Sequence, residues 1–156
     1  MLKVLFVCLG NICRSPLAEA LFKHKVKQLK IDQKYEADSC GTGDYHIGSQ
    51  PDLRTIRSAL DNGVEIFHAC RQLTVNDFSE FDFILAMDKS NHANIMRMAK
   101  LSDTQSKVFM MREFDYLKPG ADVPDPYHGD EVDFKKVFDI LNRSLDGFIA
   151  HLIENS

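Results

Sequence analysis

Short apolar runs alternate along this chain with longer segments that carry an apolar residue every three or four positions. The apolar runs cover residues 2–7, 35–40, 83–86 and 107–111, and their β-branched and aromatic content predicts buried strands. Helical spacing predicts helices over 15–30, 89–99 and 133–154, and another that follows Pro51 and stops at Asn62-Gly63. Strands that alternate with helices favour a parallel sheet covered on both faces.

Each predicted helix has one apolar face that should be buried against the sheet or a neighbouring helix. In the first helix this face consists of Ala18, Leu21, Phe22, Val26 and Leu29, and in the second of Leu53, Ile56, Ala59 and Leu60. The last helix has the longest apolar stripe, formed by Phe134, Val137, Phe138, Leu141, Leu145, Phe148, Ile149 and Leu152. Asp88 is placed to cap the helix over 89–99.

Residues 7–16, with the sequence Val-Cys-Leu-Gly-Asn-Ile-Cys-Arg-Ser-Pro, join the first predicted strand to the first predicted helix. Ser15 offers a side-chain oxygen as a helix N-cap, and Pro16 lies where a missing N–H is tolerated. Gly10 and Asn11 tolerate positive φ, so the loop can turn successive backbone N–H groups inward. Such a loop at a helix N-terminus forms a nest for an anion.

Two side chains at the edges of this loop indicate phosphate chemistry. Cys8 precedes the loop, where the helix dipole favours the thiolate, which is the nucleophilic form of sulfur. Arg14 follows it and carries a planar fork that can bind two phosphate oxygens. A lone cysteine at a strand end is more often a small buried hydrophobe. Here Gly10, Asn11, Arg14 and the Ser-Pro pair occur at the same strand-to-helix junction, and together they favour a phosphate loop with a sulfur nucleophile. Ligands of parallel sheets bind beyond the carboxyl ends of the strands, which is where this loop is expected.

Composition narrows the class of protein. The 156 residues suit one domain with one buried core, and 44% hydrophobic and 27% charged residues are typical of globular proteins. A net charge of −4 without a Lys/Arg stripe argues against a nucleic-acid partner. The six apolar residues at 4–9 are too few for a secretory signal, and no run approaches the ~20 residues of a membrane span. Four cysteines without zinc-ligand spacing indicate reduced thiols in a cytoplasm.

The stretch over 112–132 has no convincing secondary structure, which is long for a loop in a compact domain. Pro124 and Pro126 flank Asp125 and are followed by Tyr127. Two prolines stiffen the segment, so we expect an ordered functional loop. By itself, an aspartate before a proline is most often a turn residue, but a carboxylic acid above a phosphate loop would supply a proton to a departing oxygen.

The motif at residues 7–16 and the triplet Asp125-Pro126-Tyr127 together resemble the low-molecular-weight protein tyrosine phosphatases, over essentially the whole chain. The resemblance implies a single phosphatase domain over residues 1–156, an α/β three-layer sandwich whose four-stranded parallel sheet has the order 2-1-3-4. It also implies that Cys8 is the nucleophile, Arg14 the phosphate clamp and Asp125 the general acid and base. The implied reaction is hydrolysis of phosphotyrosine and aryl phosphates through a phosphocysteine intermediate.

The same resemblance assigns further residues. The substrate and phosphate sites are expected to include Leu9, Gly10, Asn11, Ile12, Cys13, Tyr45 and Tyr127. A hydrogen-bond network that holds the loop is expected from Asn11, Ser15, Ser39 and His68, although His68 alone would more simply be a buried core histidine. Cys13 is either a packed thiol or, as the resemblance implies, a redox partner that captures oxidised Cys8 as a disulfide. His24, His46, His92 and His151 are expected at the surface.

The resemblance implies no metal and no cofactor. The expected partners are phosphotyrosine-containing proteins, with inorganic phosphate or other oxyanions as inhibitors, no nucleic acid and no membrane, and the chain as a monomer or weak dimer. Many family members have two adjacent tyrosines after the Asp-Pro pair, whereas here His128 follows Tyr127. Regulation by phosphorylation of a second tyrosine therefore cannot apply. Ile12 favours phosphotyrosine, because relatives that act on phosphoarginine carry a threonine there.

Two alternatives use the same loop differently. An arsenate reductase would pass oxidation to two further cysteines on a mobile segment, but Cys40 and Cys70 lie thirty residues apart and no cysteine follows Met87. A non-catalytic phosphate-binding or redox-sensing module would use Cys8 and Cys13 alone. A complete set of nucleophile, arginine and acid argues against such a module, and an aryl phosphate assay separates the three functions.

Overall fold

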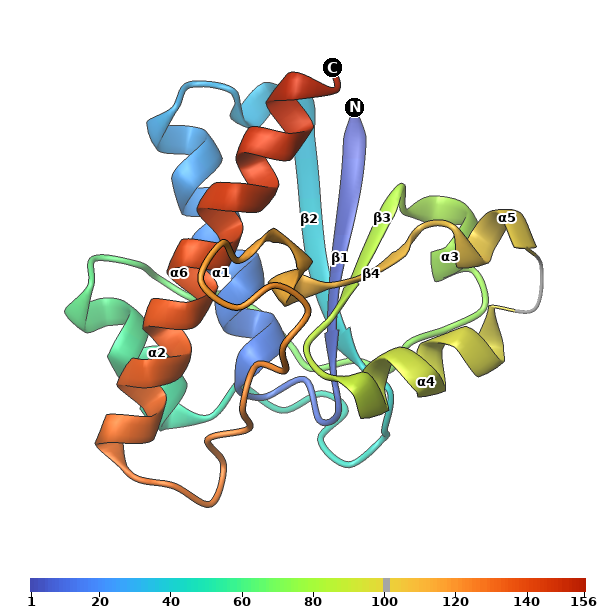
Figure 1. The fold of residues 1–156 in the computed structure, drawn as a ribbon. Helices are drawn as coiled ribbons and strands as arrows, with labels where there is room; N and C mark the ends of the chain where they lie inside the picture. Colours follow the sequence, from blue (N-terminus) through green and yellow to red (C-terminus); the bar gives the residue numbers. More distant parts are fainter. Residues whose placement is uncertain (100–101) are drawn as a thin grey trace.

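The computed structural model describes residues 1–99 and 102–156, and a parallel sheet of four strands lies at its centre (Figure 1). The strands are β1 (Leu2–Cys8), β2 (Tyr35–Gly41), β3 (Phe83–Ala86) and β4 (Val108–Met110), in the order β2-β1-β3-β4. Each pair of neighbours is parallel, and Val7 of β1 lies opposite Cys40 on one side and Ala86 on the other. The predicted strands and their order are confirmed.

Helices cover both faces of the sheet, which gives the predicted three layers. On one side lie α1 (Arg14–Gln28), α2 (Leu53–Asp61) and α6 (Glu131–Glu154), and on the other lie α3 (Asp77–Glu80), α4 (Lys89–Met98) and α5 (Ser102–Gln105) (Figure 1). Two short 3-10 helices, η1 (Asp32–Lys34) and η2 (Met111–Phe114), precede β2 and follow β4. No helix within the described ranges is both long enough and apolar enough to cross a bilayer.

The core consists of two clusters of buried side chains, one on each face of the sheet. In the larger cluster, Phe22 of α1 packs against Phe6 of β1 and Phe148 of α6, with ring centroids 5.8 and 5.9 Å apart. The whole predicted apolar stripe of the last helix is buried, and all of it except Phe134 belongs to this cluster. Because burying each such ring contributes about 1.5–3 kcal/mol, this cluster fixes β1, the strand that ends at Cys8.

The predicted N-cap of the first helix is wrong. The cap position is Cys13, no side chain caps the helix, and Ser15 lies inside the first turn. Ser15 is fully buried, and its hydroxyl oxygen lies 2.9 Å from the Asn11 side-chain nitrogen and 3.0 Å from the sulfur of Cys8. The serine is therefore a buried polar partner of the loop before the helix.

Three leucines predicted to be buried are exposed: Leu29, Leu53 and Leu60. Leu29 lies beyond the last residue of α1. In α2 the buried positions are Thr55 and Ala59, one turn apart. Leu53 lies about 200° around the helix from Thr55, and Leu60 lies about 100° from Ala59, so both leave the packed face.

The long segment after β4 has an irregular path that is held at defined points. Residues 115–130 form neither helix nor strand, but the predicted irregular stretch over 112–132 is shorter than expected, because η2 ends at Phe114 and α6 begins at Glu131. Asp115 is fully buried and paired with Arg112 and Arg143, and the hydrogen bond from Arg143 lowers the pKa of Asp115 to about 2. Further along, the buried Val123 donates its amide to the Met87 carbonyl at 2.7 Å. These anchors fix the approach of the segment to Asp125.

Candidate active site

The loop between β1 and α1 directs its carbonyl groups outward. The Cys8 carbonyl accepts from the Thr42 amide, and the Leu9 carbonyl accepts from the Gly43 amide, both at 2.9 Å. The Ile12 carbonyl accepts from the Asp52 amide at 2.8 Å, and the Cys13 carbonyl accepts from the Leu17 amide at 3.4 Å. Asn11 has a φ of 57°, in the left-handed region that reverses the chain. Within the described part of the chain, the amides of residues 9–13 have no hydrogen-bond acceptor. The loop therefore has the arrangement of an anion nest at a helix N-terminus.

Gly41, at the end of β2, allows this loop to lie directly against the neighbouring strand. A Cβ atom at Gly41 would come within 2.6 Å of the Leu9 carbonyl oxygen and 3.1 Å of the Asn11 nitrogen. The first distance is shorter than real Cβ contacts allow, so a side chain there would displace the loop. The strand predicted over residues 35–40 ends one residue before Gly41, and no local pattern indicates this close approach.

Cys8 and Arg14 lie at the two ends of the loop. Cys8 is 3% exposed at the end of β1, and its Sγ atom lies 3.0 Å from Ser15 Oγ. Arg14 donates from Nη1 to Asp88 at 2.7 Å and to the Val123 carbonyl at 3.0 Å. Burial opposes the charge of Arg14, but Cys8 and the carboxylates of Asp88 and Asp125 outweigh it and raise the arginine pKa. Arg14 is therefore a fixed cation beside the sulfur.

Asp88 was predicted only as a helix cap, and the structure gives it a second contact. Its Oδ1 atom accepts from the Asn91 amide at 2.7 Å and caps α4 as expected. Its Oδ2 atom accepts from Arg14. No signal in the local sequence indicates this second contact, because Asp88 and Arg14 are 74 residues apart.

Asp125 faces the loop from the long segment. Its Oδ2 atom lies 3.6 Å from Arg14 Nη2, and the carboxylate is about half exposed. Its Oδ1 atom accepts from the Tyr127 amide at 3.1 Å, which makes a tight turn across Pro126. The structure therefore brings together the three residues predicted to carry the chemistry, although their catalytic roles stay predictions.

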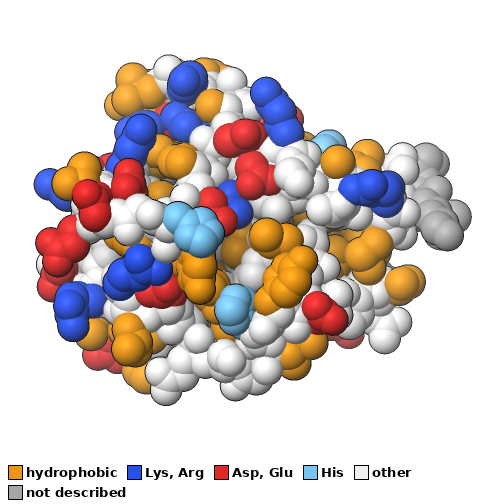
Figure 2. Space-filling model, turned by 90° about the horizontal axis from the view of Figure 1, so that it is seen from below, with side chains coloured by type: hydrophobic (Ala, Val, Ile, Leu, Met, Phe, Trp, Pro, Cys, Tyr) orange, Lys and Arg blue, Asp and Glu red, His pale blue; other side chains and the backbone are white. Residues whose placement is uncertain are grey.

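A pocket of about 410 Å³ joins these groups. Its lining contains most of the expected residues together with two histidines: Cys8, Leu9, Gly10, Ile12, Cys13, Arg14, Tyr45, His46, Asp125, Tyr127 and His128. Figure 2, seen from the end at which β1 finishes, shows hydrophobic and histidine side chains gathered near the centre of this face. Sequence analysis assigned His46 to the general surface and gave His128 no place in the pocket. Asn11 does not line it, because its side chain points into the protein.

Behind the loop, the four residues predicted to form a network are hydrogen-bonded. Asn11 donates from Nδ2 to Ser15 Oγ at 2.9 Å and to Ser39 Oγ at 3.1 Å. Its Oδ1 atom lies 2.7 Å from His68 Nε2, and Ser39 Oγ lies 3.3 Å from the same ring nitrogen. The Asn11 side chain is thus held at both ends, which keeps the left-handed residue of the loop in place.

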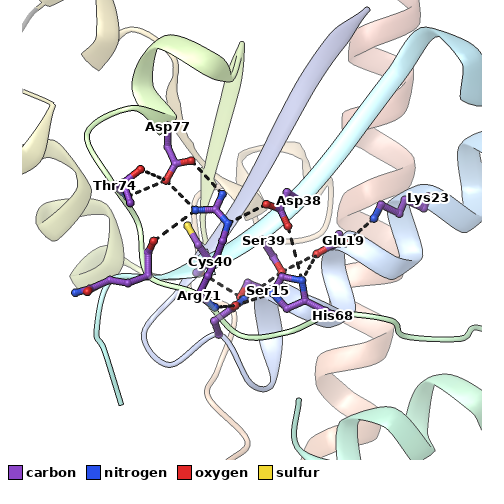
Figure 3. A network of polar contacts seen from close by, with 12 residues as sticks. Ser15, Glu19, Lys23, Asp38, Ser39, Cys40, His68, Arg71, Thr74 and Asp77 are labelled. Atoms are coloured by element: carbon purple, nitrogen blue, oxygen red, sulfur yellow. Dashed lines mark hydrogen bonds and ion pairs between the residues drawn. The ribbon is translucent and has the colours of Figure 1, made fainter. Parts of the chain in front are cut away.

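This network continues into residues that sequence analysis missed (Figure 3). Ser39 donates to Glu19 at 2.7 Å, and Glu19 also lies 3.2 Å from His68 Nδ1. Arg71 donates its amide to Asn11 Oδ1 at 3.0 Å and its Nε to Asp38 at 2.9 Å. These partners come from α1, β2 and the segment before α3, so only the folded chain reveals them.

Glu19, Asp38 and His68 also come close enough to share a cation, with candidate ligand atoms within 4.8 Å of one another. The network above already engages each of them with a serine, an arginine or an asparagine. These three residues therefore have a complete structural explanation as supports of the loop.

Cys13 lies on the same loop, is 4% exposed and lines the pocket. Burial raises the pKa of its thiol to about 12, although a hydrogen bond with Thr55 acts in the opposite direction. All four cysteines, each within the described ranges, are free thiols. Cys13 is therefore a protonated thiol at neutral pH.

Comparison with known proteins gives a consistent result. The family model of the low molecular weight phosphotyrosine protein phosphatases matches residues 3–156. The phosphatase of that name from Schizosaccharomyces pombe is 46% identical over 131 residues, which is 82% of each chain. A solved protein tyrosine phosphatase from Entamoeba histolytica superposes with a TM-score of 0.96, at 38% identity and 99% coverage of both chains. A drosophila arginine phosphatase superposes with a TM-score of 0.90, at 32% identity, over 97% of this chain and 98% of its own.

Proposed function

Because this chain belongs to the low molecular weight phosphotyrosine protein phosphatase family, we propose that it hydrolyses phosphotyrosine in proteins, and small aryl phosphates, through a phosphocysteine intermediate. The observation that carries the proposal is that Cys8, Arg14 and Asp125 line the same pocket, beside a loop whose backbone amides have no acceptor among the described residues. A sulfur nucleophile, a cation with anion-binding amides, and an acid are the three components that cleavage of a phosphate ester requires.

In the first step, the Cys8 thiolate attacks phosphorus and the bond to the phenolic oxygen breaks. Asp125 gives its proton to that oxygen, so that a neutral phenol leaves and a phosphocysteine remains. The amides of residues 9–13 and the guanidinium of Arg14 stabilise the charge on the other phosphate oxygens. This assignment is supported by Arg14 being held by Asp88 and Val123, which direct its fork before a ligand binds.

In the second step, a water molecule attacks the phosphocysteine. Asp125, now ionised, accepts a proton from that water while the sulfur–phosphorus bond breaks, and this returns the thiolate and releases inorganic phosphate. The Ser15 hydroxyl supports this step: it accepts from Asn11, so its own proton can be donated to the departing sulfur of Cys8.

The pocket walls support an aromatic substrate. Leu9, Ile12, Tyr45 and Tyr127 line it, and the two tyrosines are 69% and 41% exposed, so their rings are accessible from solvent. Flat apolar walls suit a phenyl ring. The guanidinium of a phosphoarginine substrate would instead place N–H donors against Ile12, which offers no acceptor.

We predict that the protein hydrolyses a phosphotyrosine peptide with kcat/KM at least about 10²-fold above that for the same peptide carrying phosphoserine or phosphoarginine. Ile12→Thr adds a hydroxyl to the pocket wall and should reduce the difference in kcat/KM between the phosphotyrosine and phosphoarginine peptides. Release of inorganic phosphate from the three matched peptides measures this. Ile12→Val keeps the wall apolar and should keep the preference. Equal turnover of phosphoserine, or a faster phosphoarginine reaction, would contradict the proposed substrate class.

We further propose that Cys13 protects the nucleophile from peroxide. Peroxide oxidises the Cys8 thiolate to a sulfenic acid, and the Cys13 thiol displaces water from it to form a disulfide, which an added thiol then reduces. The raised pKa of Cys13 supports the proposal that peroxide oxidises Cys8 rather than Cys13, because a protonated thiol resists direct oxidation. Such chemistry, together with four free thiols, fits a reducing cytoplasm.

Cys13→Ser is therefore expected to lose most of its recoverable activity after peroxide treatment, whereas the unmodified protein recovers nearly all of it in excess dithiothreitol. The measurement is aryl phosphatase activity before peroxide, after peroxide and after reduction. Cys70→Ser is the matched control, because it removes another buried thiol and keeps a hydroxyl to donate to the Asn11 carbonyl, as Cys70 does at 2.8 Å. If Cys13→Ser recovers as fully as the unmodified protein, the protective role is wrong.

A further inference from the structure

Arg54 connects the two halves of the candidate active site although it does not line the pocket. It lies in the first turn of α2, two residues after the cap residue Asp52. Arg54 donates from Nε and Nη2 to the two carboxylate oxygens of Asp52, at 3.1 and 2.9 Å. The Asp52 amide donates to the Ile12 carbonyl at 2.8 Å. One end of this connection is therefore fixed on the phosphate loop.

The other end reaches the segment that carries Asp125. Arg54 Nη2 also donates to the Tyr127 carbonyl at 2.9 Å, and Nη1 lies 3.4 Å from the Gly129 carbonyl. The amide of Tyr127 is the donor that holds the Asp125 carboxylate at 3.1 Å. Arg54 thus binds the carbonyl of the residue whose amide orients the acid, two positions along the chain from Asp125.

Two aromatic rings define where the guanidinium lies. Its Cζ atom lies 4.6 Å from the centroid of the Phe134 ring, in α6, and 5.7 Å from that of Tyr127. Contacts of this kind orient a planar guanidinium. Arg54 therefore touches α2, the start of α6 and the segment between residues 125 and 129, and it fixes their spacing.

We propose that Arg54 is a positioning residue for the general acid, which sets the distance from Asp125 to the phosphate loop; the role rests on the proposed phosphatase function. Asp125 is then held from two sides, by Arg14 across the pocket at 3.6 Å and by Arg54 through Tyr127. A lysine cannot replace it fully, because one point charge cannot bind a carboxylate and two carbonyls in one plane.

The test compares two substrates that differ in their need for an acid. Phenyl phosphate releases a basic phenolate that must be protonated, whereas 2,4-dinitrophenyl phosphate releases a stable anion. We expect Arg54→Ala to lower kcat/KM for phenyl phosphate by about 10-fold or more, with a change below about 3-fold for the dinitrophenyl ester. Arg54→Lys should give an intermediate loss for phenyl phosphate. In Arg54→Ala, the amides of Tyr127 and Gly129 should also exchange hydrogen faster than in the unmodified protein.

The matched control is Arg57→Ala, which removes an exposed arginine of the same helix that makes no hydrogen bond or ion pair with the described residues. This variant should leave kcat/KM for both esters unchanged, and the hydrogen exchange of the Tyr127 and Gly129 amides should also stay as it is in the unmodified protein. Equal losses on the two esters, a profile for Arg54→Ala that matches Arg57→Ala, or unchanged amide exchange would each overturn the positioning role. An unmodified protein inactive on both esters would instead overturn the proposed function and this role with it.

Discussion

Cys8→Ser is expected to lower the turnover of aryl phosphates by about 10⁴-fold or more, because a serine hydroxyl beside Arg14 has no base to make it a nucleophile. The surroundings of residue 8 predict that the variant folds: the side chain is small, buried at the end of β1 and next to the hydroxyl of Ser15. The variant should therefore still bind phosphate in the loop. Measuring kcat with 4-nitrophenyl phosphate and phosphate binding by calorimetry tests both expectations on the same preparation.

Cys40→Ala is the control for this experiment, since it removes a buried thiol from the neighbouring strand β2 and leaves the backbone carbonyl in place. It should keep near-normal turnover. Substantial activity in Cys8→Ser would remove the sulfur nucleophile from the mechanism. Loss of phosphate binding with an intact fold would show instead that the loop does not bind anions without the thiol.

Asp125→Ala is expected to lower kcat/KM for phenyl phosphate by about 10²–10⁴-fold, the usual contribution of a general acid. The loss should shrink as the leaving phenol becomes more acidic, because a stable phenolate departs without a proton. Asp125→Asn distinguishes the loss of the acidic proton from a change in the conformation of the loop. The asparagine oxygen can still accept from the Tyr127 amide, so this variant keeps the turn and loses only the proton. Both variants should show the same dependence on the leaving group.

Asp122→Asn is the matched control for the acid. Asp122 is an exposed carboxylate in the same segment that accepts from the Lys89 amide, and an asparagine can also accept there. We expect it to leave kcat/KM unchanged on every ester. If Asp125→Asn retains full activity while Asp125→Ala does not, then residue 125 acts through the turn rather than through its proton.

The parts of this fold that sequence analysis predicted are those that depend on local patterns. The four strands and the buried stripe of α6 follow from apolar spacing alone, because a strand buried on both faces and a long amphipathic helix leave few alternatives. The strand order came from the family resemblance, and the structure confirms it. The loop around Cys8 could also be predicted, because the strand before it, the loop itself and the start of the helix after it are contiguous in the sequence.

The interpretation failed where a residue's role depends on a distant partner. Ser15 has the composition of a helix cap, but Asn11 and Cys8 engage it inside the protein. Arg71 supports Asn11 from 60 residues away, and no local pattern marks it. The exposed Leu53 shows the same limit for packing: the buried face of the short helix α2 is chosen by its neighbours α1 and α6 rather than by its most apolar positions.

The shared carboxylate of Asp88 makes the local stability of α4 depend on the state of the phosphate loop. One oxygen caps the helix and the other holds Arg14, each at 2.7 Å, so the helix start and the arginine cannot move independently. Whatever fixes Arg14 more firmly, such as a bound anion, also stabilises the first turn of α4 on the opposite face of the sheet. If Arg14 binds phosphate as proposed, occupancy of the loop is thermodynamically linked to the folding of the helix that Asp88 caps.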